Sequence, residues 1–171
     1  MPVKIREAKA ADASGIAGLL RSLGLFKHIT AETPGKTRTR VARHLGLCAA
    51  DDSHSVLVAL EDGVIAGYCA AHWLPYLMLK GPEGYVSELF VSEACRGKGV
   101  GGLLLKAVEA EARARGCCRL MLLNLRTRES YQRGFYKKQG WEERKEAANF
   151  LYPLPGKPAT KHADSGRLAD K

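Results

Sequence analysis

The sequence lacks long apolar runs. No segment approaches the roughly 20 consecutive apolar residues that a membrane-spanning helix needs. The first six residues, Met1 to Arg6, also lack the apolar core of a secretory signal peptide. We therefore expect no membrane partner and a cytoplasmic location.

Cysteines are few, and their spacing does not suit a metal site. The five cysteines stand at positions 48, 69, 95, 117 and 118, and no Cys-x-x-Cys pair occurs among them. Nothing in the surrounding sequence indicates a lowered thiol pKa, which a catalytic cysteine requires. We expect reduced thiols, no metal and no cysteine nucleophile.

Acidic and aromatic residues are also few. The 18 acidic residues face 27 lysines and arginines, for a net charge of +9, and aromatic residues make up 7% of the chain. A basic protein suggests nucleic-acid binding. However, a single-strand groove needs aromatic residues interleaved with basic ones, and that pattern is missing. Nucleic acid is therefore not an expected partner, and a polyanionic cofactor accounts for part of the charge.

The remaining composition suits one globular domain. Hydrophobic residues make up 46% and charged residues 26% of a chain of 171 residues. Residues 1–154 carry strand and helix patterns, whereas residues 155–171 have no apolar periodicity, which predicts a disordered tail. We expect helices over residues 12–23, 33–49, 103–115 and 129–138, with Asp12 capping the first and Thr33-Pro34 beginning the second. A hairpin turn is expected at Asp62-Gly63 and a loop over 24–32. Strands are expected over residues 3–6, 55–60, 64–73, 85–91, 118–125, 141–146 and 149–154.

One stretch, from Tyr85 to Ala114, organises the chain. It combines a strand ending at Val91, a glycine-rich turn over residues 96–102 and a long amphipathic helix. The first N–H groups of a helix lack partners and carry partial positive charge, and glycines let these groups approach an anion closely. Arg96 and Lys98 add full positive charges. The pattern predicts a phosphate or pyrophosphate site, the alternative being a flexible turn with solvated basic residues.

Two common phosphate motifs fail here. A P-loop requires lysine at position 103, where the chain has Leu103. Gly97, Gly99 and Gly102 match the dinucleotide pattern GxGxxG, but the next strand ends near Asn124 without the acidic residue that this fingerprint needs. Neither a nucleoside triphosphate nor a dinucleotide is therefore expected.

A third pattern fits. Arg96-x-x-Gly99-x-Gly101 resembles the acetyl-CoA pyrophosphate loop of the GNAT N-acetyltransferase superfamily. The segment from Ser130 to Trp141 resembles that family's second motif, and the resemblance extends over residues 3–154. It implies an α/β (α+β) fold: a single GNAT-like domain with a mixed central sheet of about six to seven strands flanked by about four helices. It also implies acetyl transfer from acetyl-CoA, the cosubstrate, to a primary amine by direct attack in a ternary complex.

The resemblance also implies where the cosubstrate binds. Pantetheine would lie in a gap between the central strand and the next one, and a bulge in the central strand would aim an N–H group at the thioester. The implied cofactor-binding residues are Leu89, Phe90, Val91, Arg96, Gly97, Lys98, Gly99, Val100, Gly101, Gly102, Asn124, Ser130 and Tyr136. Arg133 and Lys138 are candidates for the 3′-phosphate or for a solvated helix face.

Acetyl transfer to an amine needs a base and an acid, because the amine is an ammonium at neutral pH and the leaving thiolate needs a proton. Glu88 is the predicted base, because it is the acid in the central strand. Related diamine acetyltransferases have Glu-Asp where this chain has Ser87-Glu88, so pairing of Glu88 with a basic neighbour and a water chain to Glu83 stay open. Tyr136 matches the family's tyrosine near the CoA sulfur and is the predicted acid. The second motif departs from the family pattern, with Glu129 in place of asparagine.

Further expectations concern the whole protein. The altered motif leaves open a catalytically silent acyl-CoA-binding module, and the basic surface leaves a nucleic-acid-binding protein as a lesser alternative. The final strands offer an edge for a homodimer. The acceptor is a small-molecule or peptide amine. A basic set around the first two helices predicts that this amine also bears negative charge, unless the set faces away from the pocket. The set comprises Lys27, His28, Lys36, Arg38, Arg40, Arg43 and His44.

Overall fold

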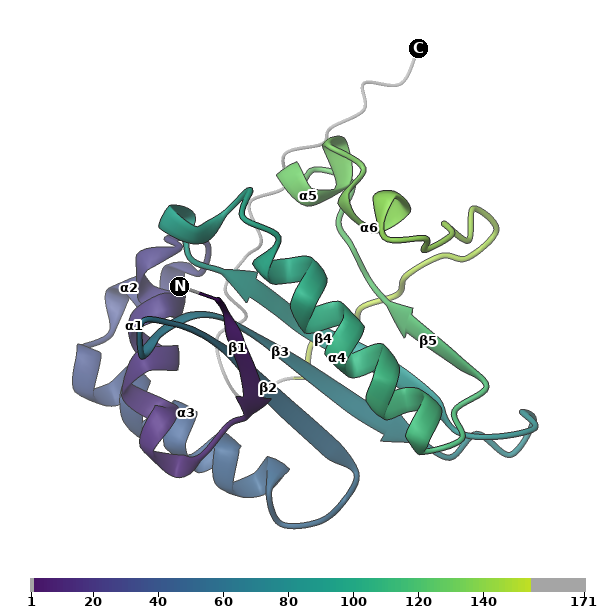
Figure 1. Ribbon diagram of the computed structural model, residues 1–171, viewed down its shortest axis with the longest axis horizontal. Coiled ribbons are helices and arrows are strands. Elements are labelled where there is room, and N and C mark those ends of the chain that lie inside the picture. Colours follow the sequence, from purple (N-terminus) through teal and green to yellow (C-terminus); the bar gives the residue numbers. More distant parts are fainter. Residues whose placement is uncertain (1, 155–171) are drawn as a thin grey trace.

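A mixed five-stranded sheet forms the centre of the computed structural model, which describes residues 2–154. The order is β1 (Lys4–Glu7), β2 (His54–Glu61), β3 (Val64–Leu74), β4 (Glu83–Val91) and β5 (Arg119–Leu122). The first four strands are antiparallel and β5 runs parallel to β4 (Figure 1). This confirms the predicted α/β class with a mixed sheet. The predicted tail, residues 155–171, lies outside the described residues.

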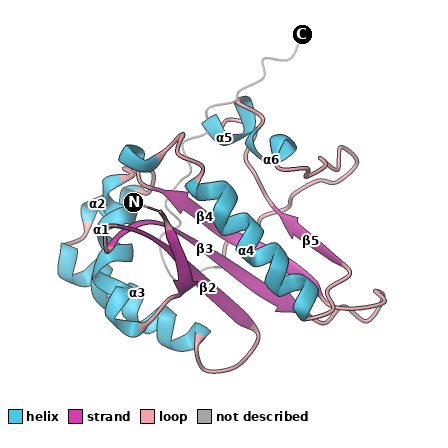
Figure 2. Ribbon diagram, in the orientation of Figure 1, coloured by secondary structure: helices cyan, strands magenta, loops and turns pink. Residues whose placement is uncertain are grey.

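The helices cover both faces of the sheet (Figure 2). One face packs against α1 (Ala13–Ser22) and α3 (Pro34–Cys48), with the short α2 (Lys27–Ala31) between them in the chain. The other face packs against α4 (Val100–Ala114). Two short helices, α5 (Glu129–Gln132) and α6 (Phe135–Lys138), follow β5. No helix within residues 2–154 is long and apolar enough to span a bilayer.

Strand alternation divides the core in two, because successive side chains of β3 point to opposite faces. Cys69, Ala71 and Trp73 lie in the core under α4, together with Leu104 and Val108. Tyr68 points the other way, into the core formed with α1 and α3. From Tyr68 to His72, the even-numbered side chains of β3 therefore share the face that is opposite to α4.

Local sequence signals explain two features of the fold. Asp62 and Gly63 both have positive φ, at 52° and 79°, as the tight turn of the β2–β3 hairpin requires. Thr33 caps α3 by accepting a hydrogen bond from the Lys36 N–H group at 3.4 Å, with Pro34 at the first helical position. Both predictions are confirmed.

Several expected boundaries were wrong. Asp12 does not cap α1; its carboxylate accepts the Lys9 N–H group and pairs with Arg6, at 2.7 Å in each case. The expected loop over 24–32 contains α2. The expected helix over 129–138 is divided into α5 and α6, because Gly134 adopts a left-handed conformation with φ of 64°.

The two final strands, expected over 141–146 and 149–154, are not formed, so the sheet has five strands. Side chains in this segment bond outside any ladder: Tyr131 and Arg126 bind the Glu143 carboxylate, and Arg144 binds Glu146. The apolar residues that would anchor the last strand face solvent, with Phe150 92% exposed. A strand needs a partner and a buried face, and this segment has neither within the described residues.

Candidate active site

The strand β5 pairs with the first half of β4, and beyond this point the chain separates from β4. Their pairing runs from Glu83 opposite Arg119 to Val86 opposite Leu122, whereas β4 continues to Val91. On the other side of β4, Ala71 pairs with Val86 and Ala70 with Glu88, so Ser87 is an extra residue in a β-bulge. The gap and the bulge implied by the resemblance are therefore both present.

A cavity of about 1050 Å³ occupies this gap. All of the predicted cofactor-binding and catalytic residues line it. They are Glu88, Leu89, Phe90, Val91, Arg96, Gly97, Lys98, Gly99, Val100, Gly101, Gly102, Asn124, Ser130 and Tyr136. Segments more than 40 residues apart in the chain thus meet at one site.

The loop over residues 96–102, here called the anion loop, leads into α4. Gly97 and Gly99 have positive φ, at 77° and 84°, a conformation that glycine adopts without strain. The N–H group of Leu103 donates to the Gly99 carbonyl oxygen at 3.0 Å, so the N–H groups of residues 100–102 precede the first intrahelical bond. These groups and the positive end of the α4 dipole fit a pyrophosphate.

The basic residues of the anion loop are paired with acids. Arg96 lies 3.7 Å from the Glu129 carboxylate, and Lys98 lies 3.2 Å from that of Glu61. The pKa of the Glu61 carboxyl is lowered, mainly by the hydrogen bond from the Cys95 thiol and next by the hydrogen bond from Lys98. Glu129, which replaces the family's asparagine, therefore contacts the loop from α5. Arg133 lines the cavity as well.

Glu88 bonds to a tyrosine rather than to a basic side chain. The Tyr68 hydroxyl donates to Glu88 Oε2 at 2.5 Å, and Tyr68 is 3% exposed. Burial, followed by the Glu88 charge, raises the pKa of Tyr68, so the phenol stays protonated and remains a donor. The alternative base, Glu83, is fully buried, pairs with Arg119, and does not appear among the residues lining the cavity.

Tyr136 lies on the β5 side of the gap. Its ring packs edge-on against Phe135 and Trp141, with centroids 4.9 and 6.1 Å away. Burial raises its pKa to about 12, with a smaller contribution from Cys69. The phenol is therefore protonated at neutral pH and can donate a proton.

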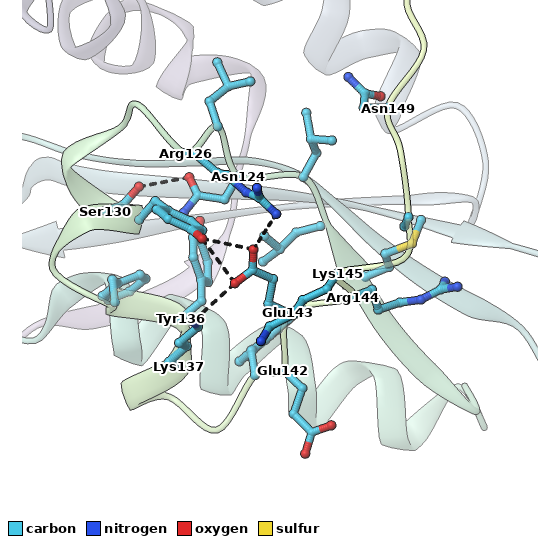
Figure 3. A pocket seen from close by; sticks show the side chains of 18 of the residues that line it. Asn124, Arg126, Ser130, Tyr136, Lys137, Glu142, Glu143, Arg144, Lys145 and Asn149 are labelled. Carbon is cyan, nitrogen blue, oxygen red and sulfur yellow. Dashed lines mark hydrogen bonds and ion pairs between the residues drawn. The ribbon is translucent and has the colours of Figure 1, made fainter.

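The segment from β5 to α5 forms one wall of the gap, and a cavity lies on each side of this wall. Ser130 Oγ donates to Asn124 Oδ1 at 3.0 Å, and both residues line a second cavity of about 710 Å³ as well (Figure 3). In that second cavity the Glu143 carboxylate accepts the Tyr131 hydroxyl at 3.0 Å and pairs with Lys137 at 3.2 Å. The Tyr131 bond is the main cause of the lowered pKa of Glu143. Asn124 and Ser130 thus brace the wall.

Sequence patterns missed part of the cavity lining. Leu25 and Phe26, between α1 and α2, line the cavity, and Phe26 packs on Phe90 at 5.6 Å between ring centroids. The sequence signal for these two lining residues was an apolar pair within a segment that was expected to be a loop. Ser87 also lines the cavity. Its role depends on strand register, which no local pattern reveals.

The members of the basic set on α3 lie apart from both cavities, whereas Lys27 and His28 on α2 directly follow Phe26, which lines the larger one. Lys36, Arg38, Arg43 and His44 are exposed on α3, and neither cavity includes them among the residues described. Arg40 bonds to Glu32 at 2.7 Å. Any effect of the α3 residues on a substrate must therefore be long-range.

Comparisons with known proteins agree with this geometry. The model of the acetyltransferase (GNAT) family matches residues 24–141. Glucosamine 6-phosphate N-acetyltransferase 1 of Oryza sativa subsp. japonica is 29% identical, over 84% of this chain and 93% of its own length. Thialysine N-epsilon-acetyltransferase of Bos taurus is 26% identical, over 70% of this chain and 73% of its own length.

A solved structure shows the same fold. An aminoglycoside acetyltransferase from an uncultured soil metagenomic sample superposes with a TM-score of 0.71 at 20% identity, covering 89% of this chain and 96% of its own. Members of this family use acetyl-CoA as the acetyl donor. Since the family model covers more than half of the sequence, the chain belongs to the GNAT acetyltransferase family.

Proposed function

We propose that this protein transfers an acetyl group from acetyl-CoA to a primary amine by direct attack in a ternary complex. The observation that carries this proposal is the cavity between β4 and β5. It brings the anion loop, Glu88 and Tyr136 to one site. A binding function alone would need the loop, but not an acid and a base on opposite walls of the same gap.

The chain offers contacts along the length of the cosubstrate. The N–H groups of residues 100–102, with Arg96 and Lys98, would hold the pyrophosphate. The free edge of β4, from Leu89 to Val91, leaves backbone groups available to pantetheine, since β5 has already separated from it. When bound, acetyl-CoA would supply an activated acyl carbon and a thiolate leaving group.

Two side chains have the proton chemistry that the transfer requires. Glu88 takes a proton from the acceptor ammonium, and Tyr136, protonated at neutral pH because its pKa is raised, donates one to the leaving sulfur. Glu88 lies on β4 and Tyr136 on α6, and both line the cavity. Such acid–base groups contribute about 10²–10⁴-fold each.

The decisive experiment measures release of the CoA thiol with a panel of primary amines. We expect release that depends on an amine and yields the N-acetylated product. A protein that acetyl-CoA stabilises against heat, but that releases no thiol with any amine, would instead be an acyl-CoA-binding module. Glu88→Gln should lower kcat while leaving thermal stabilisation by CoA intact.

We further propose that the acceptor amine bears negative charge. The relative from Oryza sativa is named for glucosamine 6-phosphate, an amine that carries a phosphate. The net charge of +9 favours such an acceptor over a polycation. Amino acids, acidic peptides and amino sugar phosphates are the classes to test.

A homodimer is part of the proposal. The outer edge of β5 has no partner strand within residues 2–154, and four apolar side chains of the following segment are exposed. These are Phe150, Leu151, Tyr152 and Leu154. An unpaired edge beside exposed apolar residues favours association. Light scattering should give twice the mass of one chain, and Phe150→Asp should shift it to one; a single-chain mass for the unaltered protein would contradict the dimer.

A further inference from the structure

The bulge residue Ser87 connects the cavity to a histidine behind it. Ser87 Oγ lies 2.7 Å from His72 Nε2, although the two residues are 15 positions apart. Ser87 lines the cavity between β4 and β5, whereas His72 is not among the lining residues. The hydroxyl therefore stands between the cavity and the imidazole.

The bulge is what places Ser87 on this face. His72 lies four residues beyond Tyr68 in the regularly paired part of β3, so the two side chains share the face opposite α4. Ser87 contacts His72 and Glu88 contacts Tyr68, so two consecutive residues of β4 point to the same side. In a regular strand consecutive side chains alternate, and one of the two would point into the core under α4.

His72 is suited to accept a proton. Its ring packs edge-on against His54 with centroids 4.6 Å apart, and Tyr85 lies 6.3 Å away on β4. Burial, followed by the charge of His54, lowers its pKa below 6.5, and the nearby Glu88 opposes this only in part. The imidazole is therefore neutral at pH 7, with a lone pair on Nε2 when Nδ1 carries the proton.

His72 can exchange protons with solvent, because its side chain is only half-buried and its neighbour His54 contacts exposed groups. His54 Nδ1 lies 2.7 Å from Ser53 Oγ, and the exposed Asp51 carboxylate lies 3.8 Å from the same nitrogen. The Ser87 hydroxyl has one other acceptor, the Ala70 carbonyl oxygen, at the longer distance of 3.4 Å. The shorter contact favours donation to His72.

An ammonium acceptor has two protons to lose before it becomes an amide, and Glu88 can hold one of them. Oε2 of Glu88 already accepts the Tyr68 hydroxyl, which leaves a single free oxygen for the amine. The second proton therefore needs another acceptor at the same point of the cavity. Ser87 is the adjacent residue.

We propose that Ser87 and His72 form this second proton route, with Ser87 contacting the acceptor nitrogen and His72 acting through it. This inference rests on the proposed acetyl transfer. Glu88 takes the first proton as one N–H bond breaks and the C–N bond forms. Ser87 Oγ takes the second while its own hydroxyl proton passes to His72 Nε2, giving an imidazolium. Tyr136 gives its hydroxyl proton to the sulfur as the C–S bond breaks, and exchange with solvent restores all three groups.

The test compares Ser87→Ala and His72→Gln with two acceptor amines. For an amine of pKa near 10, which is an ammonium at pH 7, each variant should lower kcat at least about tenfold. The acetyl-CoA KM should stay within about twofold, because neither group contacts the cosubstrate. For an amine that is already neutral at pH 7, one proton remains to be lost, and the defect should disappear.

The pH profile separates proton transfer from packing. With the ammonium substrate, kcat should fall as the pH drops through the lowered pKa of His72, because protonated imidazole cannot accept a proton. His72→Gln keeps a hydrogen-bonding side chain but should lose this acid limb. Ser87→Thr retains the hydroxyl and should retain activity. Added imidazole should restore turnover to His72→Gly.

Ser14→Ala is the matched control for Ser87→Ala, since Ser14 is exposed on α1 and does not line either cavity. Unchanged kcat and pH profile in Ser87→Ala and His72→Gln would overturn the route, as would equal defects with both amines. No thiol release by the unaltered protein with any amine would instead overturn the proposed function.

Discussion

At the scale of single residues, Tyr136 shows how surroundings determine chemistry. Burial of this half-buried phenol is the main cause of its raised pKa, and the pKa of about 12 means that it keeps its proton at neutral pH. It can therefore donate a proton without adding an ionisation step near pH 7 to the pH profile of kcat. The leaving sulfur needs such a donor.

We expect Tyr136→Phe to lower kcat at least about tenfold and to leave the acetyl-CoA KM nearly unchanged, because the ring packing on Phe135 and Trp141 is retained. Steady-state kinetics with both substrates varied would measure this. Tyr131→Phe is the control, since its hydroxyl binds Glu143 in the second cavity. An unaltered kcat in Tyr136→Phe would remove this tyrosine from the mechanism.

At the scale of elements, the start of α4 is the feature on which the proposed binding of acetyl-CoA depends. The helix begins at Val100, directly after Gly99 with φ of 84°. A side chain at this position would strain the backbone and approach any anion held by the following N–H groups. The conformation of the loop and its ligand contacts are therefore coupled.

Gly99→Val should raise the acetyl-CoA KM more than the amine KM. Gly63→Val is a close control: Gly63 also has positive φ, at 79°, but turns the β2–β3 hairpin and does not line the cavity. Both changes should lower the thermal unfolding midpoint, because valine is strained at positive φ. Equal acetyl-CoA KM values for Gly99→Val and the unaltered protein would show that the loop does not hold pyrophosphate.

At the scale of the whole molecule, we expect the net charge of +9 to act on a charged acceptor from a distance. The exposed basic residues of α3 do not line the cavities, so they influence encounter rather than contact. Their field extends roughly 10 Å at 0.1 M salt and about 3 Å at 1 M. Preference for an anionic amine should therefore depend on ionic strength.

We expect amines with a carboxylate or phosphate to have higher kcat/KM than spermidine at low salt, with the difference narrowing as salt increases. Replacing Lys36 and Arg43 together by glutamine should reduce the preference without changing kcat, because both side chains are exposed on α3. A competition assay over a salt series would measure it. Spermidine or an aminoglycoside as the best substrate at low salt would contradict the proposal.

Sequence patterns predicted the features that depend on neighbouring residues. The turn at Asp62-Gly63, the Thr33-Pro34 cap and the order of strand, glycine loop and helix from Tyr85 to Ala114 follow from conformational preferences and periodicity, which act within a few residues. The segments predicted to bind the cofactor were identified because glycine and basic residues occur there in a recognisable spacing.

Features that depend on pairing between distant segments were decided by the tertiary structure alone. Residues 141–154 were expected to form strands, but a strand exists only where another edge accepts its hydrogen bonds, and the sheet ends at β5. The bulge turns Ser87 toward His72 because β3 and β4 pair in one particular register, which no stretch of either strand specifies by itself. By itself the sequence determined the anion loop and the positions of Glu88 and Tyr136 in the chain. Their meeting in one cavity, with His72 behind Ser87, was decided by strand register and by the separation of β4 from β5, because both arise from contacts between segments far apart in the chain.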